Sequence, residues 1–442
     1  MNSYTEKAQV YFLDRGPKVP CEVIKEVYAI KYAAARANTD LGLLPRDLGE
    51  AIARTARTLY ESASCRGDII VLQTGSGTGI NMIINEEIAR RVMERYGVTV
   101  HPNDHVNLGQ SSNDVIPSAI RMAAVRSLKE LDNALDELKT ILYNKSQEYN
   151  NVLKPGRTHL RDALPTTLGD WLYSYAVNIS LIHRNLSNVL EELKSLPLGG
   201  TAVGTGVNSH PNYRERAFYY LAELTGIDYR PRNPPSSGMR LVTDIVLLSG
   251  VIRALATIYY RLSQDIRLMY SGPNTGFNEI TLLMELPGSS IMPGKKNPVR
   301  EESIMQAASY VLGLDYSLVQ SSLLGELELG MGFPLAGYTI IESIKVMESA
   351  TRKLIESAKS IVPNIDRMSE LALRSTALIT LLSPLIGYEN AAKLANRLER
   401  GDNIVEVLAS MGYSKEEIED ILSIKNLTSP GFPARRNYKD TR

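Results

Sequence analysis

Apolar residues in the middle of the chain recur every three or four positions over unusually long stretches. Three such stretches cover 116–142, 167–193 and 239–270, and a fourth covers about 299–360 with an interruption at 330–334. This spacing predicts amphipathic helices. Helices of this length suit a bundle of long antiparallel helices. The alternating pattern typical of strands is scarce, so we predict an all-α fold.

The two ends of the chain have a different pattern, which predicts three domains. Residues 1–110 mix short helical segments with loops and form an N-terminal domain, 111–360 form a central long-helix domain, and 361–442 form a small helical domain. Several long segments, such as "IVLLSGVIRALATIYY", are apolar on more than one face. A single bundle would leave part of that surface exposed. We therefore predict an oligomer that buries it.

Composition and charge exclude several classes of protein. Lys plus Arg and Asp plus Glu number 49 each, so no overall field attracts nucleic acid or an anionic membrane. Cys21 and Cys65 are too few for a disulfide framework or a four-ligand zinc site. The N-terminus lacks a secretory signal, and no stretch of about 18 uninterrupted apolar residues is present. We expect a reduced, soluble, cytoplasmic protein.

Polar, glycine-rich strings punctuate the long helical segments. They are "TGSGTGINM" (74–82), "HPNDHVNLGQSSND" (101–114), "GRTHLRDALP" (156–165), "GGTAVGTGVN" (199–208) and "GSSIMPGKKNP" (288–298). Glycine permits close backbone approach, and Ser, Thr and Asn supply short donors. Each string alone is also compatible with ordinary capping and turn chemistry. Their recurrence at the ends of bundled helices favours a compact site for a small, oxygen-rich anion.

Histidines and metal ligands narrow the candidates further. Three of the five histidines, His101, His105 and His159, lie within these strings. His183 lies between Leu181 and Leu186 on a helical segment, so we expect it to be structural. No His, Cys, Asp or Glu set has ligand spacing such as HExxH, and we expect no metal.

Taken together and in this order, the strings resemble the fumarase/aspartase superfamily and, within it, the class II fumarate hydratases. "GSSIMPGKKNP" matches the superfamily signature loop, and the similarity extends from about Ala34 to the C-terminal "GY…AAKLA" segment. The resemblance implies a three-domain fold whose long helices form a tetrameric superhelical core, with each active site built from three chains. It also implies reversible hydration of fumarate to (S)-malate through a carboxylate-stabilised carbanion, without a cofactor.

The resemblance also implies roles for individual residues. Ser289 is the expected base that removes the proton beside a carboxylate, and His159, paired with Glu302, is the expected acid/base unit for the hydroxyl or water. Lys295 and Asn297 are expected to bind the carboxylate. The rest of the expected substrate shell is Ser76, Thr78, Ser111, Ser112, Asn113 and Thr158. A second, peripheral anion site is expected at His101, Asn103 and Asp104.

The chemistry explains why such residue types are needed. When the carbon-bound proton leaves, negative charge grows on carboxylate oxygens, and fixed donors aimed there lower the barrier. Serine acts as a base only when nearby donors stabilise its alkoxide and water is kept away. A loop that opens for substrate and then closes meets both needs. This accounts for a short, cationic, glycine-rich segment at 288–298.

Two alternatives remain beside the fumarase hypothesis. An aspartate ammonia-lyase belongs to the same superfamily, but aspartases usually carry glutamine where this chain has His159, and they tend to have alanine at Gly294. "GGTAVGTG" is also the fumarase form. An alternative of another class is a non-catalytic structural relative, which would have lost the base or its cluster.

The chain departs from the usual fumarase pattern at several positions. Gly79, Ile80 and Ile83 replace polar residues, Asn274 replaces the usual arginine after "GP", and Gly330 replaces an asparagine. We expect these changes to reshape the substrate shell, which leaves the exact substrate preference open.

Overall fold

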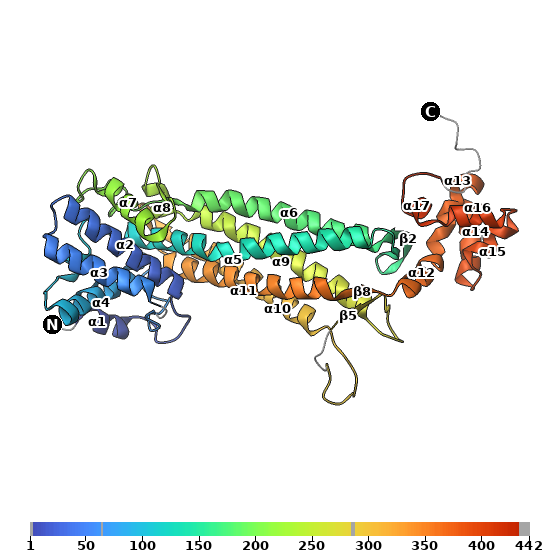
Figure 1. Cartoon of the computed structure of the whole chain (residues 1–442), viewed down its shortest axis with the longest axis horizontal. Coiled ribbons are helices and arrows are strands. Elements are labelled where there is room, and N and C mark those ends of the chain that lie inside the picture. Colours follow the sequence, from blue (N-terminus) through green and yellow to red (C-terminus); the bar gives the residue numbers. More distant parts are fainter. Residues whose placement is uncertain (1–2, 63–64, 284–287, 433–442) are drawn as a thin grey trace. The chain divides into compact units, whose positions relative to one another are not determined.

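The computed structural model describes residues 3–62, 65–283 and 288–432, and within them the chain is mostly helical (Figure 1). Its contacts define two compact units. Unit 1 comprises Met1–Leu135, Leu181–Thr257 and Gln306–Thr351, and unit 2 comprises Asp136–Ser180, Ile258–Met305 and Arg352–Arg442. The division into three domains at 110 and 360 stays a prediction.

The structure confirms the long helices that the apolar periodicity predicted. They are α5 (Ser112–Glu148), α6 (Leu168–Leu193), α9 (Thr243–Tyr270), α10 (Val299–Ser322) and α11 (Phe333–Ser360). The interruption expected at 330–334 separates α10 from α11. A Cβ on Gly332 would lie 1.9 Å from the Ser321 carbonyl oxygen, so the chain can reverse there only with glycine. Each of these helices runs from one unit into the other.

Buried charges between the long helices are paired. In unit 1, the Arg121 guanidinium on α5 donates to both carboxylate oxygens of Asp244 on α9, at 2.7 and 2.9 Å. Asp315 on α10 accepts from Ser249 at 2.6 Å and from Arg253 at 2.8 Å. Because a buried charge without a partner is costly, these pairs fix the register of neighbouring helices.

Helix α9 is long and apolar enough to cross a membrane by length and composition alone. It also carries Asp244, Ser249 and Arg253, which hydrogen-bond to side chains of other helices. These tertiary contacts are those of an internal helix in a bundle.

Shorter helices make up the rest of unit 1. They are α1 (Tyr4–Tyr11), α2 (Cys21–Asp40), α3 (Arg46–Glu61), α4 (Thr78–Tyr96), the π-helical turn η1 (Pro102–Val106), α7 (Tyr213–Thr225) and α8 (Ser236–Arg240). Helix α2 packs against both α3 and α7, which explains why it is buried on most sides. Left-handed glycines bound α4, with Gly77 at φ 76° before it and Gly97 at φ 68° after it.

The strands are short and pair two by two. Antiparallel pairs join β1 (Leu153–Thr158) to β2 (Arg161–Thr167), β5 (Ile280–Leu282) to β8 (Ile361–Pro363), and β6 (Gly325–Glu326) to β7 (Leu329–Gly330). A parallel pair joins β3 (Ser195–Leu196) to β4 (Arg230–Pro231). The polar string 156–165, for which no strand was predicted, forms most of the β1–β2 hairpin.

The C-terminal segment has a core of its own. Its elements are α12 (Ile365–Leu373), the 3₁₀ helix η2 (Thr376–Leu381), α13 (Ser383–Ile386), α14 (Tyr388–Glu399), α15 (Ile404–Ser410), α16 (Lys415–Ile421) and α17 (Ile424–Leu427). Their apolar residues pack together with Leu153 from β1. Side-chain caps at Asn403 and Ser414 start α15 and α16.

The cysteines correct one expectation. We expected them to be reduced, but Cys21 and Cys65 form a disulfide with their Cα atoms 5.7 Å apart. Cys21 is the first residue of α2, and the segment after Cys65 pairs with the residues before α2 through Val19 N–H to Ile69 O and Val71 N–H to Pro17 O, both 2.9 Å. The disulfide therefore links two segments that backbone hydrogen bonds already hold together.

Candidate active site

Three hydroxyls from two of the polar strings form a chain in unit 1. Ser76 Oγ lies 2.9 Å from Thr78 Oγ1, which lies 3.0 Å from Ser112 Oγ. Thr78 begins α4 and Ser112 begins α5, so helix N-termini hold two of these side chains. Gly75 permits this arrangement, because a Cβ there would lie 2.1 Å from the Met331 carbonyl oxygen.

Asp114 joins the serine string to the glycine string at 199–208. Its Oδ1 accepts from Ser111 N–H at 3.0 Å, and its Oδ2 accepts from the N–H groups of Gly199 and Thr201 at 2.9 and 3.0 Å. A further bond links the two strings, from Asn113 Nδ2 to the carbonyl of Ala202 at 2.9 Å. The sequence analysis did not single out Asp114, because "QSSND" reads as an ordinary capping string.

Burial governs the ionisation of Asp114 and of Lys31, a buried cation whose charge acts on it. Burial raises the pKa of Asp114 to about 6, and the three backbone N–H groups oppose that rise. The Lys31 ammonium donates to Asn107 Oδ1 at 2.8 Å and to Gln110 Oε1 at 3.0 Å. Burial lowers the pKa of Lys31 to about 7, partly offset by the charge of Asp114. Both side chains are fully buried, and the charge of each acts on the pKa of the other.

The β1–β2 hairpin in unit 2 carries Thr158 and His159 at its tip. Thr158 ends β1 and pairs with Arg161, the first residue of β2. His159 and Leu160 form the two-residue turn, and all three residues from Thr158 to Leu160 are exposed. Among the described residues, no hydrogen bond or ion pair holds the His159 imidazole.

The signature string 288–298 folds into a closed loop in unit 2. Gly288 N–H donates to the Lys295 carbonyl at 2.8 Å, and Asn297 Nδ2 donates to the Gly288 carbonyl at 2.6 Å. Ser289 Oγ accepts from the backbone N–H groups of Ile291 and Met292, at 3.3 and 3.0 Å. Two N–H groups aimed at a serine oxygen stabilise negative charge on it. The loop thus supplies the environment that a serine base needs.

A cavity of about 1130 Å³ adjoins this loop. Lys295, Lys296, Asn297, Arg267 and Glu302 are among the residues that line it. Three cations against one carboxylate favour an anion in this cavity.

Glu302 has a different neighbour from the one expected. Arg267 Nη2 lies 4.0 Å from Glu302 Oε1, and Arg267 Nε is buried without a hydrogen-bond partner in the described part of the chain. No hydrogen bond or ion pair joins Glu302 to His159 within the described residues, so their pairing stays a prediction. Arg267 was missed by the sequence analysis because it lies in a regular helix outside the polar strings.

The residues of the predicted second anion site lie together at η1. Asp104 N–H donates to His101 Nδ1 at 3.1 Å, and His101 N–H donates to His105 Nδ1 at 3.0 Å. His101, Asn103 and Asp104 are all exposed. Their role in binding an anion stays a prediction.

The unusual residues of α4 lie in the interior. A Cβ on Gly79 would lie 2.2 Å from Gln73 Oε1, which accepts from Ile80 N–H at 3.0 Å. Gln73 therefore occupies the space that a larger residue at 79 would need. Ile80 is fully buried and Ile83 is nearly so. Neither isoleucine joins the hydroxyl chain of Ser76, Thr78 and Ser112.

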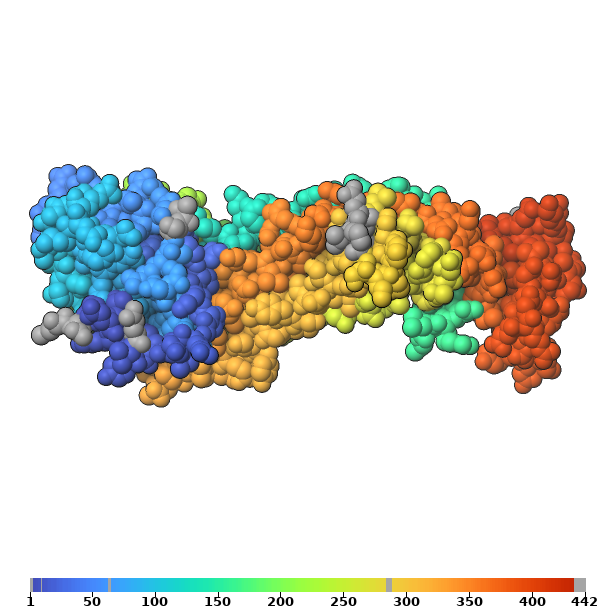
Figure 2. All heavy atoms as spheres, turned by 90° about the horizontal axis from the view of Figure 1, so that it is seen from below, coloured from blue at the N-terminus to red at the C-terminus, as the bar shows by residue number. Residues whose placement is uncertain are grey.

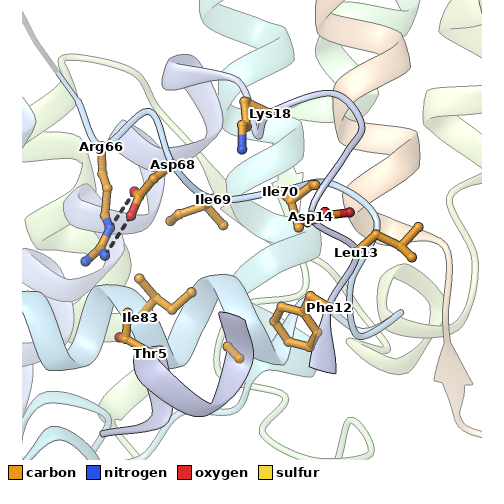
Figure 3. A pocket seen from close by; sticks show the side chains of 11 residues that line it. Thr5, Phe12, Leu13, Asp14, Lys18, Arg66, Asp68, Ile69, Ile70 and Ile83 are labelled. Atoms are coloured by element: carbon orange, nitrogen blue, oxygen red, sulfur yellow. Dashed lines mark hydrogen bonds and ion pairs between the residues drawn. The ribbon is translucent and has the colours of Figure 1, made fainter. Parts of the chain in front are cut away.

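Ile83 instead lines a separate pocket of about 270 Å³ in unit 1 (Figure 3). Figure 3 shows an apolar interior that includes Ile69, Ile70 and Phe12. The charged residues around it, Asp14, Lys18 and the Arg66–Asp68 ion pair, balance one another. None of the predicted site residues lines this pocket.

The predicted site residues divide between the two units. Unit 1 holds Ser76, Thr78, Ser111, Ser112, Asn113 and the His101 group, and unit 2 holds Thr158, His159, Ser289, Lys295, Asn297 and Glu302. Among the described residues, no group of three or more His, Cys, Asp or Glu side chains could hold a metal ion.

The chain is similar to known proteins along most of its length. The family model described as "Lyase" matches residues 14–313, and the model "Fumarase C C-terminus" matches 378–429. The class II fumarate hydratase of Saccharolobus solfataricus is 45% identical over 98% of this chain and 100% of its own length. A class II fumarate hydratase of Pseudomonas aeruginosa is 38% identical over 97% of this chain and 94% of its own.

Solved structures agree as well. The crystal structure of class II fumarase from Schistosoma mansoni superposes with a TM-score of 0.89 at 30% identity, covering 96% of this chain and 94% of that one. The fold, the matched family models and the identity along almost the whole length lead to one conclusion. The chain belongs to the class II fumarate hydratases of the lyase family.

Proposed function

We propose that this chain catalyses the reversible hydration of fumarate to (S)-malate without a cofactor. The observation that carries the proposal is the Ser289 hydroxyl, which accepts two backbone N–H groups within a cationic loop. In dehydration, the Ser289 alkoxide takes the proton from the malate carbon beside a carboxylate, and the electron pair moves into that carboxylate. The hydroxyl on the neighbouring carbon then leaves as water with a proton from His159. Hydration reverses these steps.

The cations of the cavity stabilise the charge that develops. Lys295 is exposed and lines the cavity with Arg267, so both can meet carboxylate oxygens. Removing one such donor typically costs about 3–4 kcal/mol of transition-state stabilisation. Thr158, Asn297 and the hydroxyl chain of Ser76, Thr78 and Ser112, with Ser111 and Asn113, complete the substrate shell. Glu302 is the proposed partner of His159, and His101, Asn103 and Asp104 form the proposed second anion site.

We further propose that each site combines residues from different copies of the chain in a homotetramer. Ser112 is the first residue of α5, and the hairpin with His159 follows the end of that helix. A helix of 37 residues is about 55 Å long, far more than a small dicarboxylate spans. Separate copies can bring the two sets of residues to one substrate.

The exposed apolar side chains of α10 support this assembly. Tyr310, Tyr316, Leu323 and Leu324, on α10 and just after it, are 46–71% exposed. Figure 2 shows α10 uncovered on the face that it displays, in yellow-orange. Aromatic and leucine residues that are exposed in the single chain are typical of a surface that a subunit contact buries.

We place the tetramer in the cytoplasm.

The decay or growth of the fumarate ultraviolet absorbance tests the reaction. We expect the purified protein to form fumarate from (S)-malate and to leave aspartate unchanged. Activity on aspartate alone would favour the ammonia-lyase, and activity on neither would favour a non-catalytic relative.

The variant Ser289→Ala tests the base. It should lose turnover and keep the oligomeric state of the wild type in light scattering. Rates near those of the wild type would remove Ser289 from this role.

A further inference from the structure

The tip of the β1–β2 hairpin has an unusual backbone conformation. His159 and Leu160 have φ values of 56° and 57°, and both are left-handed. A two-residue hairpin turn with two positive φ values normally takes Asn-Gly, because a Cβ is crowded in that region. Neither His nor Leu suits these positions. The sequence of the turn therefore works against its conformation.

Such a turn persists only where its surroundings impose it. An isolated two-stranded hairpin has little stability of its own. The β1–β2 pair also contains a register irregularity between Lys154 and Gly156. The contacts that keep the turn in this conformation must therefore come from residues that bind the two strands beside the tip.

Arg157, two residues before His159, is held by an ion pair and by an aromatic ring. Its Nη1 lies 2.5 Å from Oε1 of Glu279, a carboxylate that is fully buried. Its guanidinium also stacks 4.1 Å from the centre of the Phe277 ring. The ammonium of Lys154 lies 3.8 Å from the other oxygen of Glu279. One buried carboxylate thus meets two cations of β1.

The second strand is held by the start of η2. Asp162 Oδ2 accepts from Thr376 N–H at 3.1 Å, and Ser375 Oγ donates to the Ala163 carbonyl at 3.0 Å. Arg157 and Asp162 face each other across the hairpin. Both strands are therefore fixed one residue pair away from Thr158 and Arg161, which flank the turn.

We propose that Glu279 is a positioning residue for His159, because its ion pair with Arg157 holds the hairpin in the left-handed turn that fixes the imidazole. Glu279 does not touch the reacting atoms. It acts through Arg157 and the backbone of β1. Its effect on turnover rests on the proposed function, whereas its effect on the turn does not.

The test combines Glu279→Gln with Leu160→Gly. Glycine adopts positive φ without crowding, and Leu160 is 66% exposed, so its removal opens no cavity. We expect Leu160→Gly to raise the midpoint temperature of unfolding. Glu279→Gln should lower kcat about 10- to 100-fold, since a small misplacement of a reacting group has that effect. KM should change less than about threefold, because His159 serves the chemical step.

The double variant provides the decisive comparison. If the ion pair acts on the turn, the loss of midpoint temperature caused by Glu279→Gln is smaller when residue 160 is glycine. Equal losses in both backgrounds would overturn the proposal. This coupling is measured without substrate, so it holds or fails independently of the fumarase reaction.

Two further variants separate positioning from general loss of structure. Glu279→Asp keeps the charge and should recover part of kcat. Asp315→Asn removes a buried carboxylate of unit 1, which accepts from Ser249 at 2.6 Å, and should show no coupling to Leu160. Should Glu279→Gln fail to fold, Arg157→Lys and Asp162→Asn are measured against Leu160→Gly in the same way. Absence of coupling in both would also overturn the proposal.

Discussion

Asp114 shows how much one buried carboxylate can organise. It accepts N–H groups from Ser111, Gly199 and Thr201, which lie in two loops far apart in the sequence. Both of its oxygens are used, so a proton on either one would face an N–H donor and break a hydrogen bond. The ionised form therefore orders the serine string, although burial disfavours that form.

This conflict predicts opposite pH dependences for activity and stability. As the pH falls through about 6, Asp114 takes up a proton, the loops loosen and kcat/KM decreases. Its folded pKa lies above the ordinary value of 3.8, so the folded state binds a proton that the unfolded chain does not bind. The contribution of Asp114 to stability is therefore fully present below about 4 and is lost as the pH rises through about 6.

Initial rates and thermal midpoints across this range check the prediction, with Asp114→Asn as the comparison. The variant should have a lower kcat/KM throughout and no acid limb near 6. An unchanged acid limb in Asp114→Asn would assign that titration to another group.

Sequence patterns predict the chemical setting of a residue well, but they predict its contacts poorly. The strings placed Ser289 in a loop rich in backbone donors, and the structure provides two N–H groups for its oxygen. The sequence did not reveal that Gln73 fills the space beside Gly79, because that contact depends on the folded path of residues 70–80. The expectation that Ile80 and Ile83 reshape the substrate shell stays a prediction, and both side chains lie in the interior of unit 1.

At the scale of elements, period and length were sufficient for the long helices. The segments 116–142 and 239–270 form α5 and α9. A long apolar stripe with a spacing of three and four residues lies on one face of a helix, and packing against other helices buries that face. The β1–β2 hairpin was missed because its turn is His-Leu rather than Asn-Gly. A strained turn leaves no signal in the sequence, since tertiary contacts determine its conformation.

The Cys21–Cys65 disulfide ties the start of α2 to the segment before α4. It closes a loop between residues 44 apart, and cross-links of that length typically add about 2–4 kcal/mol. We expect a reductant to lower the thermal midpoint of the wild type. The double variant Cys21→Ser/Cys65→Ser should unfold at that lower temperature with or without reductant. Two freely titrating thiols in the native, oxidant-free protein would contradict this pairing.

At the scale of the whole molecule, the exposed side chains of α10 predict an obligatory assembly. Tyr316 is 69% exposed, and a carboxylate at its position would be buried without a partner in a subunit contact. We expect Tyr316→Glu to reduce the mass in light scattering and to abolish turnover. Tyr388→Glu is the matched control, because Tyr388 is 82% exposed on the C-terminal α14 and should tolerate the charge. A tetramer in the Tyr316→Glu variant would place the contact elsewhere.

The length of α5 has a consequence for mixtures of defective chains. Thr78→Val damages the hydroxyl chain that joins the start of α4 to the start of α5, and Ser289→Ala removes the base, so each variant alone should be inactive. If one pocket draws these residues from different copies, co-assembled hybrids contain some pockets in which both are intact. Refolding the two variants together should then restore part of the turnover, whereas mixing them after separate folding should restore none. Two genetically dead alleles of this gene would in that case complement each other.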